Sequence, residues 1–502
     1  MYNSFVSKAR ETGNRTVTEN GANSYKSTGD SLVDLFGVIG SLRTAEPQRI
    51  ERLFASALAE DKLLAMKLLF YARNIRGLGL GERRTFRVIL NYLATVYPVL
   101  VTKNIHNIPY YGRWDDLWDL DGTVCEDAMY QLVKDQWKED LANLKKGKPV
   151  SIMAKWIPMP NTRSKDPMAD KIMKKLGYKI YREYKTKLHE LRMAIDVVEI
   201  KMSEGRWSEI DFEKVPSRAM KNYRKAFERH GAQFAEYIKK VEKGEAKIQA
   251  STLYPYDIFK SMTLEWPVYS WGGRADNHFY FKKFDKVAEE QWKALPNYVG
   301  DGGNILVVAD TSGSMSSFGG LPINISLSLA MYFAERNHGP FKNLFMTFSS
   351  EPRFVTLKGE TLYDRIKCVE SIVDSTNLEA AFDLTLDTAV SAHVPAEDMP
   401  KAIVVISDNE IDSFEYSNHY WGFLETMKEK FRRYGYEMPN VVMWNVASRH
   451  DSYLAKSDFQ GVQFASGASA STFKALLANM GVSARELALN TLNDPIFDRV
   501  VI

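Results

Sequence analysis

The sequence predicts two parts of different fold class: a helical module over residues 31–299, followed by a doubly wound parallel α/β sheet domain over residues 300–480. Three observations predict this division. Apolar residues recur at helical spacing before residue 300, and short β-branched runs alternate with helical stretches after it. Three glycines over residues 298–303 separate the two patterns, so we place the boundary there.

The helical module rests on a repeated apolar stripe. Ile50, Leu53, Phe54, Ala57 and Leu58 follow the i, i+3, i+4, i+7, i+8 pattern of an amphipathic helix. Comparable stripes cover residues 64–72 and 86–93, and further helices are expected over residues 128–145, 169–194 and 218–243. Helix pairs joined by short polar turns predict a HEAT-like solenoid, with a plain helical bundle as the alternative.

Four apolar runs predict the strands of the sheet. Residues 304–309 and 402–406 are apolar on both faces, which is typical of central parallel strands, and residues 344–348 and 441–446 are two more strands. Helices are expected over residues 322–337, 378–390 and 422–433. Residues 1–30 are polar and predict a flexible arm, and residues 481–502 are expected to pack back on the helical module as a tail.

The composition excludes several classes of protein. The 502 residues are 45% hydrophobic and 26% charged, which rules out wholesale disorder and a fibrous chain. No apolar run approaches the roughly 18 to 20 residues of a membrane helix, and residues 1–40 lack a signal-peptide pattern. The two cysteines, Cys125 and Cys368, lie too far apart in sequence for a zinc cluster and are expected to be reduced. We therefore expect a cytoplasmic protein.

Charge is distributed unevenly along the chain. Residues 301–502 hold 16 basic and 25 acidic side chains, whereas residues 1–300 hold 50 and 38. Residues 151–250 are the densest positive stretch, with 23 basic and 14 acidic side chains. Such an excess fits a polyanionic partner, and a lysine-rich solvated helical surface is an equally weighted alternative.

A candidate metal site lies at the carboxyl ends of the predicted strands, where ligands bind in open parallel sheets. Asp310-x-Ser312-x-Ser314 follows the first strand, Asp408 follows residues 402–406, and Thr376 lies between them in sequence. Carboxylate and hydroxyl oxygens suit Mg²⁺, or another divalent cation such as Mn²⁺ or Ca²⁺. The alternative is a helix N-cap in which Asp310 and the serines satisfy free amides.

This spacing resembles the metal-ion-dependent adhesion site (MIDAS) of von Willebrand factor A (vWA) domains, whose fold is similar to the predicted sheet domain. The resemblance implies that Ser312, Ser314 and Thr376 are hydroxyl ligands, and that Asp310 and Asp408 bind the metal directly or through water. It also implies a docking contact for an acidic group of a partner. The chain departs from the pattern after Asp408, where Asn409 stands in place of the usual glycine.

A hydrolytic reading of the same site would need a general base, for which Asp408, Glu410 and Asp412 are the candidates. The sequence holds no histidine-rich ligand set, Walker A loop, Gly-x-Ser-x-Gly elbow or kinase signature. We therefore expect no catalytic residues and no enzyme activity, with a metal-dependent hydrolase as a minor alternative.

A helical module followed by a vWA domain resembles the TROVE family of Ro autoantigen-type RNA-binding proteins. Residues 71–77 with 81–84, and residues 111–118, carry the resemblance in the helical half. It implies a ribonucleoprotein component whose helical repeats close into a ring. It further implies that single-stranded RNA ends enter the central hole and that structured small RNAs bind the basic outer face.

Basic residues beside the Gly-rich turn and along residues 151–200 are the candidate RNA contacts, because guanidinium forks suit phosphate oxygens and aromatic faces suit bases. The candidates are Arg73, Arg76, Arg83, Arg84, Lys155, Arg163, Lys165, Arg182, Lys185 and Arg192. Surface ion pairs are the alternative for the arginines beside the turn. The rival function is a protein-interaction scaffold that uses the metal site and binds no nucleic acid.

Overall fold

The structure is a computed structural model that describes residues 13–159, 167–230, 232–263, 282–300, 304–369, 376–413 and 422–502. The chain forms two compact units. Unit 1 comprises Met1–Leu68, Gly77–Leu80 and Ala250–Asp494, and unit 2 comprises Leu69–Arg76, Gly81–Gln249 and Pro495–Ile502. The predicted combination of an all-helical part with an α/β part is confirmed.

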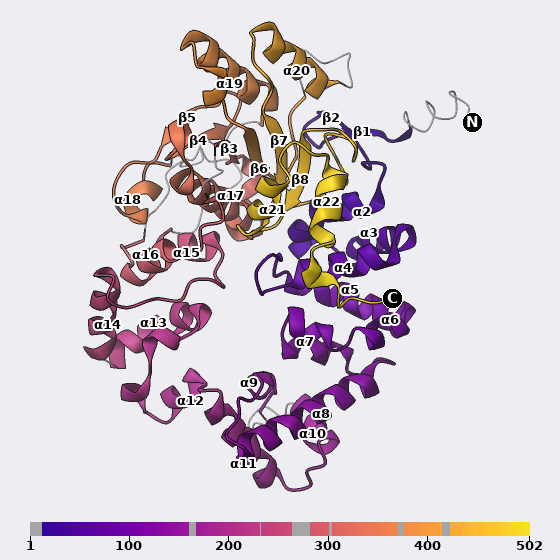
Figure 1. The fold of residues 1–502 in the computed structure, drawn as a ribbon, viewed down its shortest axis with the longest axis vertical. Coiled ribbons are helices and arrows are strands. Elements are labelled where there is room, and N and C mark those ends of the chain that lie inside the picture. The colour runs from indigo at the N-terminus through magenta and orange to yellow at the C-terminus, as the bar shows by residue number, and fades with distance from the viewer. Residues whose placement is uncertain are drawn as a thin grey trace, which may run out of the picture. The chain divides into compact units, whose positions relative to one another are not determined.

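A six-stranded sheet forms the centre of unit 1 (Figure 1). Its strands follow the order β5-β4-β3-β6-β7-β8, and every pair is parallel except β4 with β5. The strands are β3 (Ile305–Asp310), β4 (Leu344–Phe348), β5 (Phe354–Thr356), β6 (Ala402–Ser407), β7 (Asn440–Asn445) and β8 (Val462–Ser466). The chain passes from β3 to β4 on one side and returns to β6 on the other, so the topological switch point lies between β3 and β6.

The β3 and β6 strands are buried along their whole length, which explains their uninterrupted apolar sequences. They pair in register from Ile305 with Ala402 to Ala309 with Ile406. Both strands therefore end at the same edge of the sheet. The residues that directly follow β3 and β6 therefore lie close together at this edge.

Helices surround the sheet in unit 1. The central helix α17 (Ser317–Arg336) packs on β3, β4 and β6, and its regular part begins after Gly320, beside Pro322. The other helices are α2 (Ser31–Val38), η1 (Ile39–Thr44), α3 (Pro47–Glu60), α15 (Pro255–Met262), α16 (Lys286–Lys293), η6 (Gly313–Ser316), η7 (Gly339–Phe341), α18 (Leu362–Ile366), α19 (Leu378–Ser391), η8 (Ala396–Asp398), α20 (Phe423–Arg433), α21 (Thr472–Ala478) and α22 (Ala484–Leu492). Helix α4 (Lys62–Arg73) contributes residues to both units.

Within the described residues, the segment Gly313–Arg336 is the one helix long and apolar enough to cross a membrane by length and composition. Its most apolar window is 78% buried inside the fold. Packing of α17 against three strands accounts for this apolar character.

The N-terminal arm departs from its prediction, because residues 13–30 are ordered on unit 1. Strands β1 (Arg15–Val17) and β2 (Asn23–Tyr25) form an antiparallel pair, and Gly21 and Tyr25 make further antiparallel bridges to Asp412 and Tyr453. Polar composition predicted flexibility, but backbone pairing with distant segments satisfies these polar groups. Residues 1–12 of the predicted arm lie outside the described residues.

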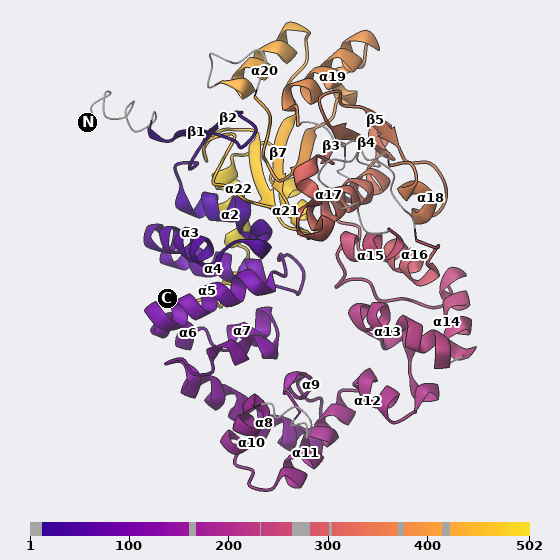
Figure 2. The same cartoon turned by 180° about the vertical axis from the view of Figure 1, so that it is seen from behind.

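Unit 2 is helical throughout its described residues. Its elements are α5 (Arg83–Val96), α6 (Pro98–Lys103), α7 (Asn107–Tyr111), η2 (Trp114–Leu120), α8 (Glu126–Lys145), α9 (Met153–Trp156), α10 (Pro167–Lys175), α11 (Tyr181–Ala194), α12 (Val198–Ser203), η3 (Trp207–Glu209), η4 (Phe212–Lys214), α13 (Ser217–His230), α14 (Ala232–Glu242) and η9 (Pro495–Phe497). Figure 2 shows α13 and α14 side by side, as a helix pair. The predicted helix over residues 169–194 is broken into α10 and α11, because Gly177 adopts a left-handed φ of +88° between them.

The domain boundaries differ from the predicted ones. Residues up to 68 and residues 250–299 cluster with the sheet in unit 1 rather than with the helical unit. Of the predicted tail, α22 belongs to unit 1, and only Pro495–Ile502 belongs to unit 2. In unit 2, Phe497 stacks on Tyr111 at a centroid distance of 5.6 Å, and Tyr111 donates a hydrogen bond of 2.5 Å to the Ile496 carbonyl. The helical stripes predicted helices correctly, but they could not indicate which apolar core each helix joins.

Candidate metal and RNA sites

The candidate metal site forms where β3 and β6 end side by side. Asp310 is the last residue of β3, and Asp408 directly follows Ser407 at the end of β6. Ser407 Oγ donates to Asp310 Oδ2 at 2.5 Å, which joins the two strand ends. The predicted proximity of the two aspartates therefore follows from the order of the strands.

The turn after β3 brings its two serines to the same place. The Ser312 amide donates to Asp310 Oδ1 at 2.8 Å, and the hydroxyl oxygens of Ser312 and Ser314 lie 3.1 Å apart. The Ser314 side chain also hydrogen-bonds to Asp408. Four of the five predicted ligands, Asp310, Ser312, Ser314 and Asp408, are thus linked by hydrogen bonds.

The electrostatics of this group favour a cation. Burial raises the pKa of Asp310 well above its usual range, and the neighbouring Asp408 raises it further. Burial also raises the pKa of Asp408, although hydrogen bonding to Ser314 and the charge of Arg449 oppose the rise. Two buried carboxylates next to two hydroxyls are an oxygen-rich, electron-rich set, and a divalent cation would compensate the repulsion between them.

The fifth predicted ligand, Thr376, lies against the loop that follows Asp408. Its Oγ1 donates to the Glu410 carbonyl at 2.8 Å, and the Asp412 amide donates to the Thr376 carbonyl at 3.0 Å. A hydroxyl group can donate its hydrogen to a carbonyl while a lone pair faces a cation. Asp310, Ser312, Ser314 and Asp408 therefore fit a small divalent cation, and Thr376 stays a predicted fifth holder, because its contacts are to the loop that follows Asp408.

Sequence reasoning missed an arginine at this site. Arg449 lies four residues past the end of β7, and its Nη2 is 3.0 Å from Asp408 Oδ2. Its Nη1 is 2.8 Å from Glu19 Oε2, so one guanidinium joins the candidate metal ligand to the N-terminal segment. Inspection of the residues after every strand, including residues 441–446, would have brought Arg449 into the set.

A second group of ligand-type side chains adjoins the first. Carboxylate oxygens of Glu19 and Glu410 and a ring nitrogen of His450 lie within 4.8 Å of one another. His450 Nδ1 is 2.9 Å from Glu410 Oε1, and the Glu19 amide donates to Glu410 Oε2 at 2.6 Å. Both Glu410 oxygens are therefore engaged, and Glu19 is paired with Arg449, so hydrogen bonds and an ion pair satisfy this group without a metal.

Two of the candidate RNA contacts in unit 2 are structural. The side chain of Arg73 is 2% exposed, and its Nη2 lies 2.7 Å from Oδ2 of the fully buried Asp116. Arg192 donates to the carbonyls of Ala154 at 2.9 Å and Ile157 at 2.7 Å, and burial lowers its pKa. Their donor groups hold the helical unit together, which corrects the prediction that they face RNA.

The remaining candidates occupy different environments. Arg83 forms an ion pair with Asp115 at 2.6 Å, and Lys155 lies 3.9 Å from Glu199. Arg76 is exposed, with its guanidinium 5.7 Å from the Tyr110 ring centroid. Arg84, Arg182 and Lys185 are exposed on α5 and α11. Arg163 and Lys165 lie outside the described residues.

Arg113 is a basic residue that the sequence reasoning did not select. Its guanidinium lies 4.8 Å from the Trp156 ring centroid. Burial lowers its pKa, and the positive charges of Arg73, Arg83 and Arg218 lower it further, although Asp115 opposes them. The carboxylates of Asp116 and Asp115 pair with Arg73 and Arg83, so the feature left at this place is the Arg113 guanidinium over the Trp156 ring.

Comparisons with known proteins cover nearly the whole chain. The family model described as "Domain of unknown function (DUF2828)" matches residues 18–127 and 161–305, and "Domain of unknown function (DUF7788)" matches residues 304–495. An uncharacterized protein of Acanthamoeba polyphaga mimivirus, L728, is 26% identical over 537 aligned positions, which cover 97% of this chain and 89% of that protein.

Among solved structures, the Ro (RSR) protein of Deinococcus radiodurans aligns over 94% of both chains at 14% identity, with a TM-score of 0.34. A score this low does not establish a shared fold. Neither family description names RNA or a metal, so the TROVE and vWA resemblances stay predictions. The DUF2828 model matches more than half of the residues, and the chain therefore belongs to the DUF2828 family.

Proposed function

We propose that this chain is a non-enzymatic RNA-binding protein, a Ro-like ribonucleoprotein component, which binds single-stranded ends or small structured RNA on unit 2. In this proposal the sheet of unit 1 carries a divalent cation that stabilises the fold or docks a partner. The observation that carries the RNA proposal is the placement of the Arg113 guanidinium over an aromatic ring, in a unit with a basic excess. The guanidinium lies 4.8 Å from the Trp156 ring centroid.

This arrangement suits RNA for a physical reason. A guanidinium group can donate two parallel hydrogen bonds to the oxygens of one phosphate. Aromatic rings beside the phosphate contacts give bases a surface for stacking. Residues 151–250 add a basic excess of 23 to 14, most of it in unit 2.

A titration of RNA with a free single-stranded end tests the proposal, with fluorescence anisotropy at two salt concentrations as the measurement. Affinity should fall steeply with salt, by about 0.7 counterions for each phosphate contact. The double variant Arg84→Glu and Lys185→Glu reverses two exposed charges on unit 2 and should weaken binding. Arg433→Glu on unit 1, whose side chain is 78% exposed, is the matched control. Equal affinity of both variants and the wild type would refute the proposal.

A second candidate function is a protein-interaction scaffold, which the buried pair of Asp310 and Asp408 favours. A cation held by these carboxylates would keep a position open for an acidic side chain of a partner. Asp310→Ala should then abolish Mn²⁺ binding and partner capture while RNA binding survives. Loss of RNA binding in Asp310→Ala, with the melting temperature unchanged, would argue against separate roles for the two units.

A further inference from the structure

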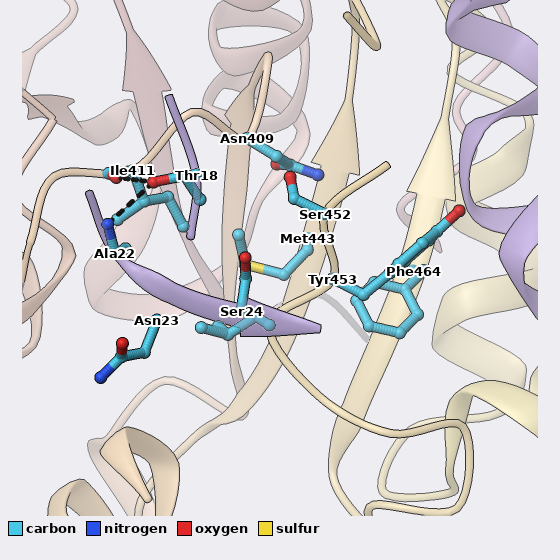
Figure 3. Close-up of a pocket in the computed structure, with 11 residues that line it drawn as sticks. Thr18, Ala22, Asn23, Ser24, Asn409, Ile411, Met443, Ser452, Tyr453 and Phe464 are labelled. Atoms are coloured by element: carbon cyan, nitrogen blue, oxygen red, sulfur yellow. Dashed lines mark hydrogen bonds between the residues drawn. The ribbon is translucent and has the colours of Figure 1, made fainter. Parts of the chain in front are cut away.

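The N-terminal segment 18–22 lies across the loop that follows Asp408 in unit 1. Thr18 Oγ1 donates to the Ile411 carbonyl at 2.5 Å and accepts from the Ala22 amide at 2.9 Å (Figure 3). The Ala22 amide also donates to the Ile411 carbonyl at 3.3 Å. The Ser413 amide donates to the Asn20 carbonyl at 3.2 Å. The segment therefore pairs with residues 411–413 as a short antiparallel edge, which the bridge between Gly21 and Asp412 completes.

The same segment contacts the candidate metal ligands. Asn20 Nδ2 donates to the Glu410 carbonyl at 2.7 Å, and it lies 3.4 Å from Thr376 Oγ1. Glu19 pairs with Arg449, and Arg449 pairs with Asp408. An acidic side chain and an amide of the N-terminal segment thus reach the group that would hold the cation.

We propose that segment 18–22 is a built-in occupant of the docking face beside the cation site, and that an extended acidic segment of a partner protein displaces it to bind there. The inference rests on the proposed docking role of that site. Glu19 occupies the position that an acidic side chain of the partner would take. Arg449 can pair with the carboxylate of Glu19 or with that of the partner. The backbone of residues 411–413 would pair with the partner as it pairs with this segment.

The contacts of the segment are of a kind that a competing segment can replace. The side chains of Glu19 and Arg449 are 48% and 28% exposed, so water and a competing carboxylate can reach their ion pair. A small pocket beside the segment is lined by Thr18, Ala22 and Ser24 of the N-terminal part and by Asn409, Ile411 and Met443, among others (Figure 3). At this pocket Ser24 Oγ and Asn409 Oδ1 are buried without a protein hydrogen-bond partner, which weakens the attachment.

Arg449 is the residue that couples the segment to the cation site. Without a cation, its guanidinium compensates part of the negative charge on Asp408. A cation bound to Asp408 would compete with Arg449 for that carboxylate. Arg449 would then pair with Glu19 or with an acidic side chain of a partner. Occupancy of the cation site and the choice of acidic segment are therefore linked through one side chain.

A peptide-binding measurement on the full chain tests this inference. The probe is a fluorescent peptide that copies residues 17–25, added in saturating Mg²⁺. In Glu19→Lys the segment faces Arg449 with a like charge and should leave its place. The fraction of molecules with an uncovered docking face then rises. The peptide should therefore bind to this variant at least about tenfold more tightly than to the wild type. Glu351→Lys makes the same charge change on a side chain that is 82% exposed, and it should behave as the wild type.

Hydrogen exchange of the Ala22 and Ser413 amides gives a second readout, because both amides bond across the interface. Their protection should fall in Glu19→Lys and stay unchanged in Glu351→Lys. Equal peptide affinity in all three proteins, or full protection of both amides in Glu19→Lys, would overturn the inference. Mn²⁺ binding, measured separately by electron paramagnetic resonance, shows whether a failure lies in the cation site or in the segment.

Discussion

Arg73 and Asp116 form a buried ion pair in unit 2, with side chains that are 2% and 0% exposed. Asp116 Oδ2 accepts from Arg73 Nε at 2.8 Å and from the Arg113 amide at 2.9 Å, while Oδ1 accepts from Arg87 Nε at 2.9 Å. One carboxylate therefore ties together α4, α5 and the start of η2. Residues 71–77 and 111–118 thus meet at this carboxylate.

Asp116→Ala should destabilise the protein severely. The substitution leaves the Arg73 charge buried and uncompensated, for which we expect a loss of about 3–5 kcal/mol in the free energy of unfolding. Chemical denaturation followed by circular dichroism measures this loss. Asp127→Ala, at a side chain that is 96% exposed, is the control and should change stability little. Equal stability of the two variants would show that Asp116 does not support the helical unit.

Asp310→Asn should remove the stabilisation that a bound cation gives while it leaves the stability of the cation-free protein nearly unchanged. In buffer with a chelator, the variant should lie within about 1 kcal/mol of the wild type, because removal of one buried charge offsets the altered hydrogen bonds. At a free Mg²⁺ concentration about 100 times Kd, the wild type should gain about 2.7 kcal/mol and the variant should gain none. Thermal unfolding with and without Mg²⁺ measures both quantities. A cation effect of equal size in the two proteins would place the ion elsewhere.

The sequence predicted the centre of the sheet domain well for a physical reason. Strands β3 and β6 are buried on both faces, so their composition alone indicates central strands. The prediction missed β5, which has only three residues, and β8, where Gln463 interrupts the apolar run. Gln463 is buried nonetheless, because its amide donates to the Asn479 carbonyl.

At the candidate metal site, the sequence likewise predicted the residues that follow local patterns and missed those that come from distant segments. Asp310, Ser312 and Ser314 are fixed by one turn, and Asp408 by the end of the neighbouring strand, so spacing and strand order found them. Glu19 and Arg449 come from segments 430 residues apart in the chain, which no local pattern relates. Their proximity depends on the antiparallel pairing of the N-terminal segment, and polar composition does not encode that pairing.

Asp451 should make the stability of unit 1 depend on pH in the acidic range. Burial alone would raise its pKa, but hydrogen bonds from Arg49 at 2.9 Å and Arg52 at 2.5 Å outweigh burial and lower the pKa below its ordinary value of 3.8. The folded chain thus favours the carboxylate, so the ion pairs stabilise the fold fully above that ordinary value. Their contribution is lost as the pH falls through the lower folded pKa.

Asp451→Asn tests this dependence. At neutral pH the variant should be less stable than the wild type by about 1 kcal/mol, since Arg52 is largely exposed and its pair is screened. The difference should shrink as the pH approaches 3 and below, as measured by urea denaturation across the pH range. Asp458→Asn, at an exposed position, is the control and should show no such trend. A difference that grows on acidification would contradict the assigned role of Asp451.

Gly40 should tolerate no side chain, because η1 approaches the end of β8 at this residue. A Cβ atom on Gly40 would lie 2.6 Å from the Ser466 carbonyl oxygen and 2.9 Å from the Gly467 Cα. These are backbone atoms, so the clash cannot be relieved by a rotamer change, and Gly40→Ala should cost about 1–3 kcal/mol or more. Gly13→Ala introduces the same methyl group where no atom lies within 4 Å, and it should leave the unfolding midpoint unchanged. A stable Gly40→Ala variant with native hydrogen exchange at β8 would show that η1 does not press on the sheet as described.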